Sequence, residues 1–423
     1  MTSRLGRAAA LLFALFFLLA LLEFGDVRAQ EARPAKLPTF DMTYDVGIVA
    51  SEKSAHVEII LGAGSEVVEW IIFRFDPMRH RAIEADGELR EVENGIEWKP
   101  PPGGGSIRYV FSIDHLRDDN AYDARCAKSW AIFRGRDLVP TMRVRTVPSA
   151  RSRSRMRLRL PEEWSVALPY TRFRGGIYAL DNPRTRVDRP NGWFAFGKLG
   201  IVRETIEGSR IAIAAPAGQG VRRMDILALL SWTLPSLREV FGDLPKRLQI
   251  VLAGDPMWRG GLSGPNSVFV HADRPLIGQD SSSPLIHELV HSLMHARAGR
   301  DGDWVVEGIA EYYSIAILRR SGTLSASRYE SAIEAMRKRA EGAGDLFASS
   351  VDVPTRSRAV EILMEIDDAI RKATGGASNL DSAVRHLTEA NERVTTERFR
   401  AAVSEAAGRD LSEIFDPLVA DRD

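Results

Sequence analysis

The sequence predicts an α+β protein in which a β-rich N-terminal domain, a mixed domain and a C-terminal helical domain follow one another. Three observations lead to this prediction. Up to about residue 205 the chain reads as short strands, beyond Ser325 it reads almost wholly helical, and between these parts a helix carries the motif His287-Glu-x-x-His291. We therefore expect domains at residues 30–205, 206–323 and 324–423, after an N-terminal segment at residues 1–29.

The composition is that of a folded protein without a dominant charge. The 423 residues include 57 basic and 57 acidic side chains. Proteins that bind nucleic acid usually carry a large excess of basic residues. Because the charges balance here, we expect no nucleic-acid partner. The arginines of Arg151–Leu160 recur at a period of two, which favours the solvent-facing side of β-strands over an anion-binding patch. Cys126 is the only cysteine, so no intrachain disulfide can form.

The first 29 residues are organised like a secretory signal. Arg4 and Arg7 precede the apolar run Ala8–Leu22, and Val27-Arg-Ala29 offers a cleavage site before Gln30. The run is shorter than the roughly 20 residues that span a bilayer. We therefore predict an exported protein, periplasmic or secreted, with no membrane span after cleavage; an uncleaved anchor is the alternative.

The N-terminal domain is predicted to be β-sandwich-like. Its candidate strands are short, and turn residues at Pro101–Gly105 and Pro190–Gly192 separate them. The strands are expected at His56–Leu61, Val67–Phe75, Ile107–Ile113, Thr141–Val147 and Arg155–Leu160.

The middle domain begins with a helical pattern at Val221–Phe241, in which Pro235 is expected to cause a kink or a break. The largely apolar run Leu248–Ala253 is consistent with a buried strand. The Gly-rich stretch Gly260–His271 predicts an edge strand whose free backbone groups pair with an extended peptide. A structural loop and strand without substrate contact is the alternative. The candidate substrate-binding residues are Gly260, Gly261, Leu262 and Ser263.

The central motif predicts a zinc site. Residues four apart lie on one face of a helix, so His287 and His291 can both bind one metal at roughly 2.0–2.1 Å. Glu288 follows the first histidine, in the position of a general base that reaches a water molecule without binding the metal. Ser283 is suited to be the N-cap of this helix, and Pro284 to be its first residue.

A catalytic zinc usually has three protein ligands and one open position. Glu307 lies a short connection downstream, on a second helical pattern that starts after Asp303, and is the expected third ligand. Glu311 shares its face one turn later. It is suited to accept the other N–H of a liganding histidine. We expect one zinc ion per chain.

These motifs resemble those of the gluzincin, or thermolysin-like, metallopeptidases, in which His-Glu-x-x-His is followed by a downstream Glu. Trp304–Tyr313 and Leu318–Gly322 are most similar to the glycyl aminopeptidase family and aminopeptidase N. The resemblance covers roughly the second half of the chain. It implies a thermolysin-like fold for residues 206–323 and an N-terminal β domain. The connection between His291 and Glu307 is shorter than is usual in those families.

The C-terminal domain is expected to close the cleft with helices at Ser325–Arg339, Arg356–Thr374, Asn379–Leu387 and Thr396–Ala407. In aminopeptidase N a tyrosine of a Tyr-x-Lys-Gly-Ala segment donates to the tetrahedral intermediate. The matching stretch here, Thr355–Ala359, has no tyrosine. Arg356 or Arg358 is the expected replacement, because a guanidinium is a permanent donor. Two exposed arginines in the first turn of a helix are the alternative.

The function predicted from these features is that of a zinc metallopeptidase that acts on peptide or protein substrates. A zinc-activated water attacks the peptide bond, and Glu288 is the general base. Aminopeptidase and endopeptidase activity are both open, although Gly260–Asn266 lacks the glutamate that aminopeptidase N has in its glycine-containing strand. A zinc-binding protein that holds a peptide or protein partner without turnover is the alternative. The sequence gives no indication of the oligomeric state.

Overall fold

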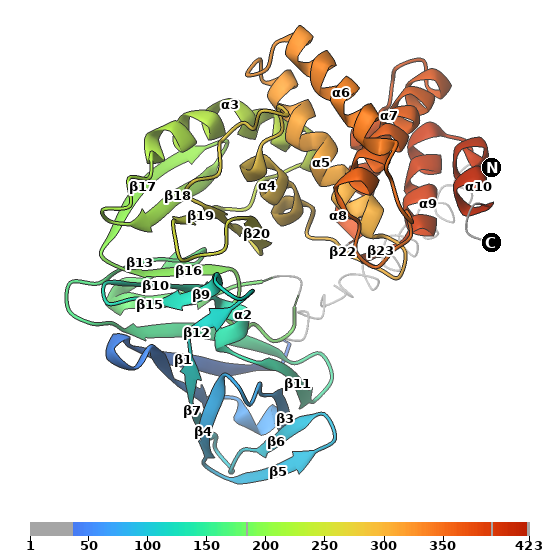
Figure 1. Ribbon diagram of the computed structural model, residues 1–423. Coiled ribbons are helices and arrows are strands. Elements are labelled where there is room, and N and C mark those ends of the chain that lie inside the picture. Colours follow the sequence, from blue (N-terminus) through green and yellow to red (C-terminus); the bar gives the residue numbers. More distant parts are fainter. Residues whose placement is uncertain (1–36, 183–184, 391, 421–423) are drawn as a thin grey trace, which may run out of the picture. The chain divides into compact units, whose positions relative to one another are not determined.

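Three β-sheets surround a shared apolar core in the N-terminal part of the computed structural model (Figure 1). The structure describes residues 37–182, 185–390 and 392–420, so the expected signal segment lies outside the described residues. The sequence predicts a β-sandwich-like domain, and the strands of this part form three sheets. The sheets have the strand orders β14 (Thr171–Arg172), β15 (Ile177–Leu180), β12 (Arg151–Arg159), β1 (Thr39–Val49), β2 (Ser54–Leu61), β7 (Gly105–Ser112), β4 (His80–Ala85); β11 (Thr141–Thr146), β3 (Val68–Arg74), β6 (Gly95–Lys99), β5 (Glu88–Val92); and β13 (Ser165–Ala167), β16 (Trp193–Gly197), β10 (Trp130–Arg134), β9 (Tyr122–Cys126), β8 (His115–Leu116).

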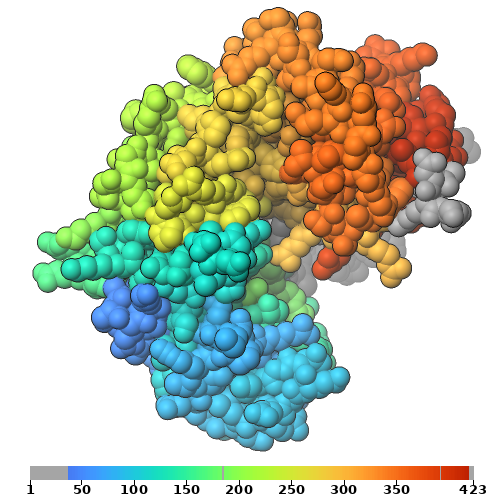
Figure 2. All heavy atoms as spheres, in the orientation of Figure 1, coloured from blue at the N-terminus to red at the C-terminus, as the bar shows by residue number. Residues whose placement is uncertain are grey.

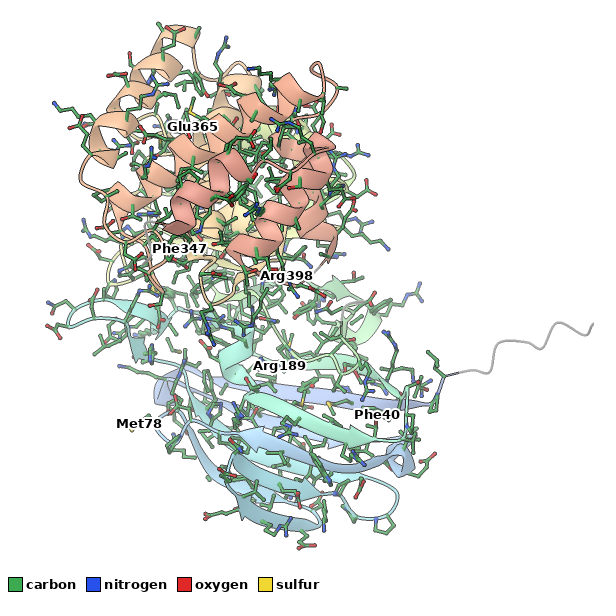
Figure 3. All side chains as sticks on the ribbon, turned by 90° about the vertical axis from the view of Figure 1, so that its right-hand side faces the viewer. Phe40, Met78, Arg189, Phe347, Glu365 and Arg398 are labelled. Atoms are coloured by element: carbon green, nitrogen blue, oxygen red, sulfur yellow. The ribbon has the colours of Figure 1, made fainter. Side chains whose placement is uncertain are left out.

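The arginine-rich stretch forms strand β12, as the period of two predicts, and β12 pairs in parallel with β1. Arg153 and Arg155 both donate to Asp41 of β1, at 2.7 and 3.0 Å. Phe40, the neighbour of Asp41 in β1, is fully buried, whereas Met78, which lies between β3 and β4 and outside both strands, is 85% exposed (Figure 3). Because successive side chains of a strand point to opposite faces, the arginines of β12 lie beside an acidic residue and solvent, and the apolar residues of these strands lie in the core.

A fourth sheet has the order β17 (Leu199–Ile206), β18 (Ser209–Pro216), β19 (Arg247–Ala253), β21 (Ser267–His271), β20 (Gly261–Gly264). The sheet begins at Leu199, upstream of the boundary expected at residue 206, because β17 pairs along its length with β18. The stretch Gly260–His271, predicted as an edge strand, forms two strands, of which β20 lies at the edge and β21 in the interior of the sheet. Helix α3 (Arg223–Phe241) continues through Pro235 without the expected break, and its apolar face belongs to the same core as this sheet.

The rest of the described chain is mainly helical. Helix α4 (Pro284–Met294) starts as predicted: Ser283 accepts a hydrogen bond from the Ile286 N–H, and proline is its first residue. Helix α5 (Asp303–Arg320) packs on α4. Helix α7 (Val353–Ala373) starts slightly earlier than the helix that the sequence predicts at Arg356–Thr374. None of the helices in the described ranges is both long and apolar enough to cross a membrane. The remaining elements are α2 (Gly135–Leu138), α6 (Ala326–Ala340), α7 (Val353–Ala373), α8 (Leu380–Ala390), α9 (Thr396–Ala407), α10 (Ser412–Ala420), and the pair β22 (Arg297–Ala298) and β23 (Arg393–Val394).

Candidate metal centre

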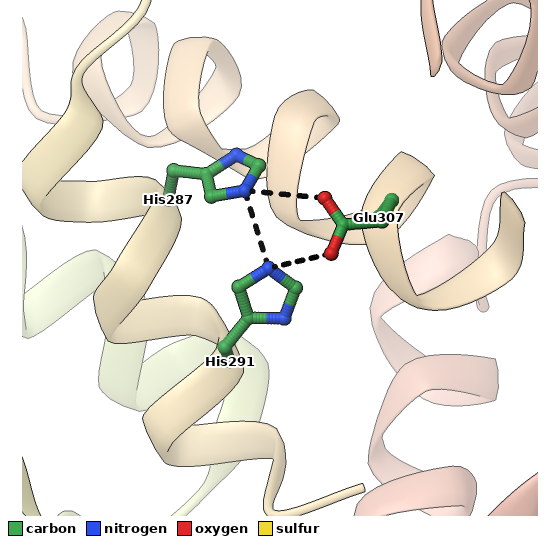
Figure 4. Close-up of side chains that lie close together, drawn as sticks. All are labelled: His287, His291 and Glu307. Carbon is green, nitrogen blue, oxygen red and sulfur yellow. Dashed lines mark hydrogen bonds and ion pairs between the residues drawn. The ribbon is translucent and has the colours of Figure 1, made fainter. Parts of the chain in front are cut away.

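The structure brings together the three residues that the sequence predicts to be metal ligands. His287 and His291 come from successive turns of α4, and Glu307 comes from α5 (Figure 4). The two Nε2 atoms lie 3.2 Å apart. Glu307 places Oε1 3.3 Å from His291 Nε2 and Oε2 3.5 Å from His287 Nε2. In the described part of the chain this trio forms a cluster whose ligand atoms all lie within 4.8 Å of one another.

The three side chains have the chemistry of zinc ligands. In a tetrahedral site with bonds of roughly 2.0–2.2 Å, neighbouring ligand atoms lie about 3.3–3.6 Å apart. The two Nε2 atoms lie 3.2 Å apart, close to this range, whereas the separations of 3.3 and 3.5 Å reach different oxygens of Glu307, so that each imidazole faces its own carboxylate oxygen. Two imidazoles and one carboxylate are also a donor set that zinc sites use in hydrolytic enzymes. The residues present therefore fit a zinc ion bound by His287, His291 and Glu307.

Glu311 lies where the sequence predicts it, one turn after Glu307. Its Oε2 is 3.2 Å from Nδ1 of His287, so the Nε2 of that ring is directed at Glu307 and His291. Burial alone would lower the pKa of His287, but the carboxylates of Glu307 and Glu311 outweigh it and raise the pKa to about 9. Burial likewise opposes ionisation of Glu307, but the two histidines hold its pKa well below the ordinary range.

The side chain of Glu288, a residue of α4, faces strand β20. Burial raises the pKa of its carboxyl group, and the backbone of Ser263 in β20 hydrogen-bonds to that group. The side chain packs directly on Gly261, since a Cβ atom at this glycine would lie 2.6 Å from Cγ of Glu288. Gly261 and Ser263 therefore contact the candidate general base.

Other contacts fix strand β20 and limit its free edge. The indole N–H of Trp193 donates to the carbonyl of Leu262 at 2.8 Å, and Ser292 of α4 donates to the carbonyl of Gly264 at 2.9 Å. Gly260 is buried, and its missing side chain makes room for the ring of Trp258. Gly260 is therefore held against Trp258, and the substrate contact that the sequence predicts for it stays a prediction.

The loop before β20 also lies against the N-terminal strands (Figure 2). Tyr122 of β9 accepts a backbone hydrogen bond from Trp258 and donates one to Pro256. The position of β20 beside Glu288 thus depends on residues that are distant in sequence.

The structure separates the two arginines that the sequence proposes as oxyanion donors. Arg356 of α7 places Nη1 3.4 Å from Oε2 of Glu307. Arg358 instead donates to Glu361 of the same helix at 2.9 Å. Residues two apart on a helix point in different directions, so only one of the pair reaches the ligand cluster.

The architecture is similar to solved peptidase structures. An aminopeptidase N family protein from Idiomarina loihiensis is 14% identical and has a TM-score of 0.67, over 89% of this chain and 75% of that one. An M1 zinc metallopeptidase from Deinococcus radiodurans is 17% identical with a TM-score of 0.57, over 90% of this chain and 92% of that one. The fold is that of the M1 zinc metallopeptidases.

Legionella pneumophila aminopeptidase A has a TM-score of 0.54 at 11% identity, over 90% of this chain and 49% of that one. Comparison of the sequence with known families and with curated proteins finds no match. At such low identity, the likeness to the M1 structures supports the fold and not the role of any single residue.

Three contacts near the centre have no signal in the sequence. Trp193 and Ser292 hold β20, and Trp258 covers Gly260. Each partner lies outside the motifs, so only the paired strands and the packed helix reveal it.

Proposed function

We propose that the protein is a zinc metallopeptidase with one zinc ion per chain, bound by His287, His291 and Glu307. The observation that carries this proposal is the close approach of three zinc-type ligand side chains next to a half-buried glutamate that is not part of the trio. The M1 fold of the chain supports it.

Each residue has a task in this proposal. Zinc, when bound, acidifies a water molecule and polarises a carbonyl group. Glu288 accepts the proton of the attacking water and passes it to the leaving amine. Burial raises the pKa of the Glu288 carboxyl group, which favours a carboxyl group that accepts a proton and passes it on. Glu311 fixes the ring of His287 through Nδ1.

Strand β20 supplies the substrate platform in this proposal. Gly261, Leu262 and Ser263 are partly exposed and form the edge beside Glu288. Because the carbonyls of Leu262 and Gly264 already accept hydrogen bonds, we expect a short rather than an extended stretch of peptide to pair with this edge.

The test combines metal analysis with digestion of a peptide library that contains free and N-acetylated peptides. We expect one zinc per chain and cleavage products, and the Glu288→Gln variant should keep the zinc and cleave at least about a hundredfold more slowly. Cleavage confined to free N-termini identifies an aminopeptidase, and cleavage of blocked peptides an endopeptidase. Zinc-loaded protein that binds peptides and cleaves none would contradict the proposal and support the non-catalytic alternative.

We also propose export, on the basis of the basic start, short apolar run and small residues before Gln30. Protein isolated from the producing cell should begin near Gln30 by N-terminal sequencing. A mature protein that retains Met1 in the cytosol would contradict this proposal.

A further inference from the structure

A cation reaches the ligand cluster from a helix that carries none of the ligands. Arg356 of α7 is 3.4 Å from Glu307, and both side chains are 27% exposed. Among the described residues, no other arginine or lysine forms an ion pair with Glu307. Arg356 therefore brings positive charge to the edge of the candidate metal centre while it stays accessible.

The guanidinium has unused hydrogen-bonding capacity. An arginine offers five N–H donors, and the contact with Glu307 engages Nη1. Its Nε is buried and has no hydrogen-bond partner among the described residues. The nearby carboxylates of Asp303 and Asp352 accept the backbone N–H groups of Val351 and Thr355, respectively. A buried N–H without a partner is unfavourable, so the guanidinium is suited to a further acceptor.

The hydroxyl groups of α5 that follow the ligand are committed elsewhere. Tyr313 donates to Asp381 of α8 at 2.7 Å, and Ser314 donates to the carbonyl of Glu311. Tyr312 is buried. Among the described residues that form ion pairs with Glu307, Arg356 is the most exposed, at 27%, and its guanidinium always carries donors.

We propose that Arg356 donates a hydrogen bond to the carbonyl oxygen of the scissile peptide bond; this inference rests on the proposed peptidase function. As the water oxygen bonds to the carbonyl carbon, the π electrons of the carbonyl group move to its oxygen, and the proton of the water moves to Glu288. The carbon–nitrogen bond then breaks, and this proton passes to the leaving nitrogen. Arg356 keeps all its protons, and its fixed charge stabilises the oxygen that becomes negative.

The experiment compares zinc-loaded wild type with Arg356→Gln, Arg356→Lys and the matched control Arg358→Gln. For each protein we measure the zinc content, kcat/KM, and the affinity for a phosphinic peptide, which mimics the tetrahedral intermediate, by calorimetry. Affinity for the corresponding cleavable peptide is measured in the Glu288→Gln background.

We expect Arg356→Gln to keep its zinc and to bind the cleavable peptide within about threefold of the parent. Its kcat/KM and its affinity for the phosphinic peptide should both fall by about a hundredfold or more, the loss typical of a removed oxyanion donor. Arg356→Lys should lie between Arg356→Gln and wild type, because it keeps the charge with fewer donors. The control should match wild type, since Arg358 pairs with Glu361.

Wild-type affinity of Arg356→Gln for the phosphinic peptide would overturn the inference. Loss of zinc from this variant would also overturn it, because Arg356 would then hold Glu307 rather than the substrate. An equal loss of kcat/KM and of phosphinic-peptide affinity in Arg358→Gln would also overturn the inference. If the zinc-loaded wild type neither cleaves peptides nor binds the phosphinic peptide, the proposed function fails and the inference fails with it, so the two failures are distinguishable.

Discussion

Gly261→Ala tests whether the contact between strand β20 and Glu288 controls activity. A Cβ at this position would lie 2.6 Å from Cγ, 2.8 Å from Oε1 and 3.0 Å from Cδ of Glu288. Separation of the Cβ and Cγ atoms from 2.6 to 3.4 Å requires a shift of 0.8 Å. Cγ is close to the backbone, so rotation of the carboxylate alone does not relieve the clash. A displacement of about 1 Å at a reacting group costs on the order of a hundredfold in rate.

We therefore expect Gly261→Ala to bind one zinc ion and to lose about a hundredfold in kcat/KM, with a free energy of unfolding lower by about 1–3 kcal/mol from overpacking. Zinc analysis, peptide hydrolysis and urea unfolding measure these three effects. Gly254→Ala is the matched control, because a Cβ there would meet only the Cβ of Ala272, at 3.9 Å. Wild-type activity of a zinc-loaded Gly261→Ala protein would refute the assigned position of Glu288.

His291→Ala should abolish stoichiometric zinc binding, because two of the three ligands remain; a full equivalent of zinc by metal analysis would show that the ligand set is wrong. In the metal-free protein the pKa of His287 is raised to about 9. Protonated His287 therefore stabilises the folded state fully below a pH of about 6.5, the pKa of histidine in the unfolded chain, and this stabilisation is lost as the pH rises through 9. Urea unfolding should show a loss of up to about 3 kcal/mol over this range without zinc and little loss with zinc, since zinc binds the neutral ring; the same pH dependence in both forms would argue against this. Burial raises the pKa of the Cys126 thiol to about 12, so iodoacetamide should label it only after unfolding; stoichiometric labelling of the native protein would contradict this burial.

Local patterns were sufficient to predict the helices near the metal centre. The period of α4 places His287 and His291 on one face, and Ser283 and Pro284 fix where the helix starts. Of the kink or break expected at Pro235, the break does not occur, because tertiary packing prevails over intrinsic propensity: the apolar face of α3 shares a core with the sheet on both sides of the proline.

The organisation of the β strands was harder to predict, because strand order depends on partners that are distant in sequence. The pairing of β1 with β12 joins Thr39 to Arg151, and no local pattern specifies such a parallel partner. Likewise, nothing within Leu199–Ile206 specifies which sheet the strand joins or that β18 is its neighbour. Short stretches of sequence were enough to predict some strands, such as β12, but not others, such as β1 and β10, and they do not specify the sheet to which a strand belongs.

The same distinction applies within the candidate site. The spacing of His287, Glu288 and His291 on one helix is enough to propose a metal and a base. The residues that surround them belong to other elements: Gly261 of the edge strand β20 packs on Glu288, and Arg356 of α7 contacts Glu307. Neither contact follows from spacing, because each depends on how two separate elements pack. A zinc motif that is complete in the sequence therefore leaves open how its candidate base and ligands are surrounded, because the packing of separate elements determines those contacts.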